Sequence, residues 1–142
     1  MEALFYYYNN ELFDGQLGDC LLNLSRKNGA SGYLSPNRWT DAGNTRRIHE
    51  ISINPDTWDI EDEEVHRTIV HEMCHMCQQD HGEPSRRFYH NQEWGERMIS
   101  VGLLPSSTGK PGGKTTGQHM SDYTIEPGAF KTAFDKISLN GN

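Results

Sequence analysis

The sequence is short of cysteine, of long apolar runs and of positive charge, and each shortage excludes a class of protein. Its 142 residues include 3 cysteines, an odd number that does not suit a framework of disulfides. No stretch approaches the roughly 18 apolar residues of a membrane span, and the acidic, aromatic N-terminus is unlike a signal peptide. We therefore expect a cytoplasmic protein with reduced thiols and no membrane segment.

Positive charge is scarce in the first three quarters of the chain. Residues 1–104 hold 9 Lys or Arg against 17 Asp or Glu, whereas residues 105–142 hold 4 against 3. Neutralisation of phosphates supplies most of a protein's affinity for nucleic acid. The acidic body therefore argues against strong unaided binding to DNA, and we expect at most a weak, steeply salt-dependent association.

Aromatic residues are plentiful, with 3 Trp, 6 Tyr and 5 Phe, although only 34% of the residues are hydrophobic. These side chains can bury large surfaces, and 142 residues suit one compact domain. We expect a monomer. The sequence favours a core domain over residues 1–104, a flexible Gly/Ser/Lys loop over 105–118 and a C-terminal segment, 119–142, that docks on the domain.

Periodicity and breakers indicate where the elements lie. We predict a helix over 2–13 closed by Gly15, a buried strand over 20–25, strands over 29–39 and 46–55, a helix capped by Asp56 or Asp59 that runs to about Gln79, and a helix over 86–101 stopped by Gly102. Short strands among helices are typical of an α+β fold.

The stretch VHEMCHMC, residues 70–77, carries the clearest chemical signal. On a helical projection Val65, Ile69, Met73, Met76 and Cys77 share an apolar arc, and His71 and His75 lie together on nearly the opposite side. Imidazoles at i and i+4 can reach one zinc ion at about 2.0–2.1 Å. Glu72 would project beside the ion, where it could deprotonate a metal-bound water.

Three other residues of this helix have a plainer interpretation. Cys74 and Cys77 form a CxxC pair, but both fall on the apolar side and no second pair exists to complete a four-cysteine site. We expect them to be small buried residues. His66 falls within the apolar arc, which predicts a core or edge histidine.

A catalytic zinc needs a third protein ligand and one open position. His81 has the spacing of the last histidine in HExxHxxGxxH, but Gln78 stands where that pattern needs glycine. His90 follows a short loop that could return it to the first pair, and Glu93 lies close to His90 in sequence. Spacing alone leaves all three candidates open.

An ordered set of segments resembles a known family. The segments are YYYNNELFDGQLGDCLLNLSRKNGASGYLSP (6–36), EISINP (50–55), TIVHEMCHMCQQDHG (68–82) and FYHNQEWGERMISVGL (88–103). Together they resemble the SprT-like zinc metallopeptidases, the group that includes the Spartan proteases. Tyr89 and Asn91 stand where the family usually has glycines, and Trp94 matches the aromatic residue that the family has four residues after its third histidine.

The resemblance implies one Zn²⁺ per chain, with His71, His75 and His90 as ligands and Glu72 as the general base. Residues 105–142 contain no cysteine, so we expect a small member without the C-terminal zinc ribbon of many others. The segment GQHMSDYTIEPGAF (117–130) is similar to one in small members from phages and mobile elements. Spartan-type proteins cleave proteins crosslinked to DNA, which makes DNA-associated proteins one candidate substrate. Arg86 and Arg87 are candidate DNA contacts, or else a solvated surface pair.

We therefore expect a zincin-like minimal metallopeptidase with a small mixed or antiparallel sheet, packed on the HExxH helix and on a second metal-ligand helix. Zinc would lie between the HExxH helix and the strand at 48–53, whose edge would align a protein or peptide substrate. Tyr123 is a candidate oxyanion stabiliser. The alternatives are a nucleic-acid-associated module whose structural zinc is closed by His81 or Glu93, and a partner or inhibitor of another enzyme.

Overall fold

The computed structural model describes residues 2–25, 32–40, 43, 47–56, 58–84 and 89–140. These residues form helices α1 (Glu2–Phe13), α2 (Glu63–His81), α3 (Gln92–Ser100) and α4 (Ala129–Asn140), and strands β1 (Cys20–Leu24), β2 (Gly32–Thr40), β3 (Arg47–Ile53), β4 (Leu103–Ser106) and β5 (Ser121–Thr124). The strands make one three-stranded and one two-stranded sheet. The predicted α+β class is therefore confirmed.

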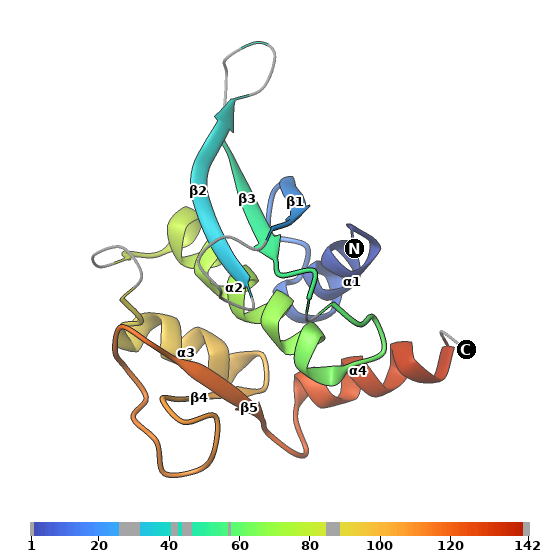
Figure 1. Cartoon of the computed structure of the whole chain (residues 1–142), viewed down its shortest axis with the longest axis vertical. Helices are drawn as coiled ribbons and strands as arrows, with labels where there is room; N and C mark the ends of the chain where they lie inside the picture. The colour runs from blue at the N-terminus through green and yellow to red at the C-terminus, as the bar shows by residue number, and fades with distance from the viewer. Residues whose placement is uncertain are drawn as a thin grey trace.

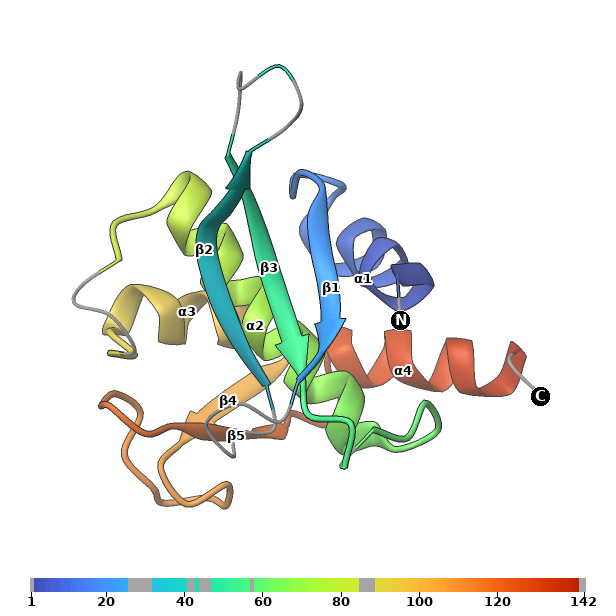
Figure 2. The ribbon, with the colours of Figure 1, turned by 45° about the horizontal axis from the view of Figure 1, so that its top comes forward.

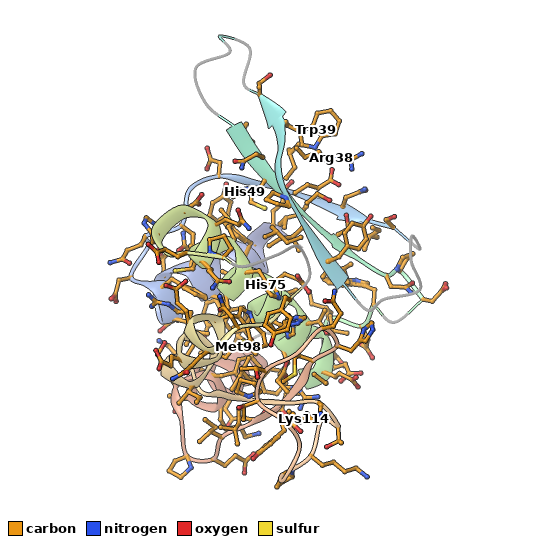
Figure 3. The ribbon with its side chains drawn as sticks, turned by 90° about the vertical axis from the view of Figure 1, so that its left-hand side faces the viewer. Arg38, Trp39, His49, His75, Met98 and Lys114 are labelled. Atoms are coloured by element: carbon orange, nitrogen blue, oxygen red, sulfur yellow. The ribbon has the colours of Figure 1, made fainter. Side chains whose placement is uncertain are left out.

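Helix α2 runs through the middle of the molecule (Figure 1). The three-stranded sheet packs on one side of it, and α3 with the β4–β5 hairpin lies on the other side (Figure 3). The apolar arc predicted for this helix is buried: Val65, Ile69, Met73, Met76 and Cys77 are each at most 3% exposed. Burial of this arc fixes the rotation of α2, and with it the direction in which the other face points.

The three-stranded sheet corrects two predictions. Its order is β1-β3-β2, with β1 parallel and β2 antiparallel to β3. Strand β1 was predicted to be buried, but it is an edge strand on which Leu21 and Leu24 are almost half exposed. Strand β3 was predicted to offer an edge to substrate, but both of its edges are occupied by neighbouring strands (Figure 2). A peptide could join this sheet only at β1 or β2.

The ends of the two central helices also differ from the predictions. The N-cap of α2 is Asp62, whose side chain accepts a hydrogen bond from the Glu64 amide, whereas Asp59 is used in the preceding turn. Helix α3 begins at Gln92, not at residue 86, because the Asn91 side chain caps it through the Trp94 amide. It ends before Gly102, as predicted.

The C-terminal part of the chain packs on three of these elements: the β4–β5 hairpin on α2 and α3, and α4 on α1. Pro105 and Ser106, at the start of the predicted loop, belong to β4, which pairs antiparallel with β5. Helix α4 lies beside α1 (Figures 1 and 2), and its Phe130 is fully buried and stacked on Tyr8. A Cβ at Gly102 would lie 2.6 Å from the Phe130 amide nitrogen, so this close approach requires glycine. None of the described helices is long and apolar enough to cross a membrane.

Candidate metal centre

Three imidazoles meet beside the middle of α2. His71 and His75 lie one turn apart on that helix, and His90 lies just before α3. One nitrogen of each ring lies within 4.8 Å of a nitrogen of both others. Figure 3 shows His75 near the centre of the molecule, between the sheet and α3. A group this compact, with three imidazole donors, could hold a metal ion.

A short backbone bridge holds His90 in this position. The His90 amide donates to the Gly117 carbonyl at 2.8 Å, and the Gly117 amide donates back to the His90 carbonyl at 3.0 Å. Asn91, the next residue, caps α3. The segment before α3 is therefore fixed on one side by the helix it begins and on the other by the chain that leads into β5.

The indole of Trp94 touches all three imidazoles. It stacks on His75 with a centroid separation of 5.0 Å and an interplanar angle of 17°. His71 and His90 meet it edge to face at 4.8 and 4.6 Å. Trp94 is fully buried in the first turn of α3, so its indole is a buried surface on which all three imidazoles pack.

Two hydrogen bonds at Nδ1 orient two of the three imidazoles. His71 Nδ1 donates to Asp122 Oδ2 at 2.9 Å, and His90 Nδ1 donates to the Gly117 carbonyl at 3.0 Å. Each bond occupies Nδ1 and leaves the Nε2 lone pair of the same ring for a ligand. Metal-bound histidines usually have such a partner on their second nitrogen. The donor set and its orientation therefore fit a metal ion.

Metal binding requires neutral imidazole, and two of the three rings are held in that form. Burial, together with His71 and His90, holds the pKa of His75 well below its ordinary value. Burial and His71 lower the pKa of His90 to about 4. Burial alone would lower the pKa of His71, but the hydrogen bond to Asp122 and the nearby Glu72 raise it.

The carboxyl group of Glu72 lies beside the cluster and takes no place among the three donors. Its Oε2 is 4.0 Å from His71 Nε2, the nitrogen left for a ligand. The side chain is buried, and burial raises the pKa of its carboxyl, although the charge of His71 works in the opposite direction. A buried carboxylate at this distance can reach a small molecule held in front of the imidazoles.

The structure brings His90 to the first pair and leaves the other two candidate ligands elsewhere. His81 Nε2 lies 3.3 Å from the Gln16 carbonyl. The Glu93 carboxylate accepts hydrogen bonds from the Gln78 side chain and from the Glu83 amide, so it links the end of α2 to α3. Of the three candidates that spacing left open, His90 is the one that joins the cluster.

One further predicted site residue, Tyr123, is not part of this arrangement. Asp122 and Thr124 both contact α2, and alternate residues of a strand share a face. Tyr123 therefore faces away from the histidines, and its role as an oxyanion stabiliser has no support from this geometry. Arg86 and Arg87 lie outside the described residues, and their contact with DNA stays a prediction.

The plainer interpretations of three α2 residues are confirmed. His66 is buried, with Nδ1 2.6 Å from the Tyr8 hydroxyl and Nε2 2.5 Å from the Ile60 carbonyl. Because a carbonyl can only accept, Nε2 carries the proton and Nδ1 accepts from tyrosine. Cys74 and Cys77 are free thiols buried in the core.

Together, the described residues define an α+β protein with a three-histidine group that could hold a metal ion. The chain matches the SprT-like family over residues 1–111 and belongs to that family. The family is associated with metallopeptidase-like activity. No curated protein and no solved structure was found to match the chain.

Proposed function

We propose that this protein is a zinc-dependent metallopeptidase that hydrolyses peptide bonds. The observation that carries the proposal is the position of the Glu72 carboxylate, 4.0 Å from His71 Nε2 and outside the set of three imidazoles. A site that only stabilised the fold would have no use for a buried carboxylate there. Membership of a family associated with metallopeptidase-like activity supports the same conclusion.

His71, His75 and His90 would hold the zinc ion. Three neutral nitrogen donors suit zinc and leave the open position that a catalytic site needs. When bound, zinc would act as a Lewis acid that polarises the scissile carbonyl and makes water more acidic. The chain's own residues would supply the remaining chemistry.

Glu72 would be the general base and then the general acid. Its carboxylate would accept a proton from the attacking water and pass it to the leaving amine. Its pKa is raised by burial, which makes the group a stronger base than an exposed glutamate and a more effective carrier of the proton. Trp94 would keep the imidazoles in place while this proton moves.

The edge of β2 would align the substrate as an added strand. At one end of β2, a Cβ added to Gly32 would lie 2.8 Å from Thr68 Cγ2, so the strand passes close to α2 there. Towards the other end, the Asn37 amide donates a hydrogen bond to His49 Nδ1. His49 Nε2 in turn lies 2.7 Å from Asp80 Oδ1 of α2. The β2 edge thus follows the part of α2 that carries His71 and His75, which supports an extended protein or peptide substrate.

The test combines metal analysis with a proteolysis assay on the pure protein and its Glu72→Gln variant. Glutamine keeps the shape of the side chain but cannot accept the proton. We expect about one zinc per chain in both proteins and turnover lower by ~10²-fold or more in the variant. The assay is run with and without single-stranded DNA, because a DNA-associated protein is one candidate substrate. Zinc without any peptidase activity in the wild type would favour a structural metal site.

A further inference from the structure

The hydrogen-bond partners that orient two of the three imidazoles come from outside the segment that matches the family. The match ends at residue 111, whereas the Gly117 carbonyl holds His90 and the Asp122 carboxylate holds His71. We propose that Asp122 is a positioning residue that sets the orientation and the metal affinity of His71. This inference rests on the proposed metal site and adds the C-terminal segment to it.

The hairpin geometry explains why Asp122 reaches the site. Pro105 of β4 is paired with Asp122 of β5, and Leu103 with Thr124. Leu103 and Pro105 are buried, so these pairs form the inner face of the hairpin. From that face Asp122 reaches His71, and Thr124 donates to the Glu63 carboxylate at 3.3 Å. Two residues of one strand therefore fix β5 against α2.

Asp122 is also held from a second direction. Its Oδ1 lies 3.6 Å from Arg67 Nε, and its Oδ2 accepts the hydrogen bond from His71. Arg67 and His71 are one helical turn apart, so the carboxylate spans neighbouring side chains on one face of α2. Asp122 is only 7% exposed, which keeps water from competing for the bond to His71.

A carboxylate in this position has two effects on a metal-binding imidazole. It fixes the tautomer with the proton on Nδ1 and makes Nε2 a better donor to the metal. Losing such a partner typically weakens metal affinity by about 10–100-fold. An Asp122 that only stabilised the hairpin would leave both the affinity and the environment of the metal unchanged.

The experiment measures zinc affinity by competition with a chromogenic chelator for the wild type, Asp122→Ala and Asp122→Asn. Each protein is also loaded with cobalt(II), whose visible spectrum reports the geometry of the metal ligands. Ser121→Ala, a change at an exposed neighbour on β5, is the matched control. Unfolding of the metal-free proteins in urea shows whether the fold has changed.

We expect zinc affinity to fall by about 10–100-fold in Asp122→Ala, together with a shifted cobalt spectrum. Asp122→Asn retains an oxygen that can accept the hydrogen bond from His71 Nδ1, so it should recover part of the affinity even if alanine disturbs the hairpin. Wild-type affinity and spectrum in both Asp122 variants would overturn the inference while leaving the proposed function intact. A wild type that binds no zinc would overturn the proposed function itself, and the inference with it.

Discussion

Helix α2 and the segment from Gly117 to Thr124 both contribute to the histidine cluster, but in different ways. Helix α2 supplies His71, Glu72 and His75 from little more than one turn, on a helix whose other face is the core of the protein. The C-terminal segment supplies one carbonyl and one carboxylate, which hold imidazoles that belong to other elements. Helix α2 provides two of the three donors, and the C-terminal segment orients His71 on that helix and His90 just before α3.

This difference separates fold stability from metal affinity. Burial of the α2 face is worth several kcal/mol per large side chain, so damage to that face should unfold the protein. Strands β4 and β5 have four residues each. Damage to their contacts with the imidazoles should weaken metal binding while most of the core stays intact. Variants at the points where the two regions meet can test this separation.

The largest effect is expected at His90, the donor that the C-terminal segment holds through the backbone bridge to Gly117. His90→Ala removes one of three donors, and we expect the zinc content to fall from about one per chain to near zero. His81→Ala is the matched control, because His81 contacts the Gln16 carbonyl instead of the cluster. Metal analysis after gel filtration gives the result. If zinc were lost in His81→Ala and retained in His90→Ala, the third ligand would be His81 and not His90.

The next largest effect is expected at Trp94, whose indole packs against all three imidazoles. Trp94→Ala leaves a large cavity under the cluster and should lower the free energy of unfolding by about 3–5 kcal/mol. The indole Nε1 is buried without a hydrogen-bond partner among the described residues. Trp94→Phe therefore loses no hydrogen bond and should cost less. Urea unfolding of the metal-free proteins measures both, and equal losses would show that ring size is not what matters.

The parts of this arrangement that depend on local sequence could be predicted. The apolar arc of α2 repeats with the period of a helix, so the sequence predicts which side chains are buried and that His71 and His75 project together. Helix α1 and the glycine after α3 follow from equally local signals. The cap of α2 was missed because Asp56, Asp59 and Asp62 are chemically equivalent, and only the geometry of the turn selects Asp62.

The rest depends on contacts between distant segments. Whether β1 lies at an edge or in the centre is decided by which strand pairs with β3, and no local pattern encodes that choice. Asp122 is 51 positions from His71 and carries no motif of its own. The one available signal was the DYT stretch, in which a charged residue sits within a short strand-like segment. It becomes informative only when the hairpin is placed against α2.

A smaller effect, at the N-terminal end of α2, should depend on pH and not on the metal. Burial lowers the pKa of His66 below 6.5, so the folded state holds this imidazole neutral while the unfolded chain can protonate it. The unfolded state therefore binds more protons below pH 6.5, and stability is full above that pH and is lost as the pH falls.

His66→Gln removes this contribution to the pH dependence. Between pH 7.5 and 5.5, the metal-free wild type should lose more stability than the variant, by at most about 1.4 kcal/mol for each pH unit. Urea unfolding at the two pH values measures the difference. Equal losses in both proteins would mean that His66 does not titrate differently in the folded and unfolded states.

The smallest effect is expected at Tyr123, the residue next to Asp122 on β5. Asp122 faces α2, and the alternation of the strand turns Tyr123 to the opposite side, where it is paired with Leu104. Tyr123→Phe should therefore change zinc affinity and turnover by no more than about twofold, the usual range for a change away from a site. Steady-state kinetics and chelator competition on the variant measure both quantities. A tenfold or greater loss of turnover with zinc retained would bring the Tyr123 hydroxyl into the reaction, and the hairpin would then supply a catalytic group as well as the orientation of His71.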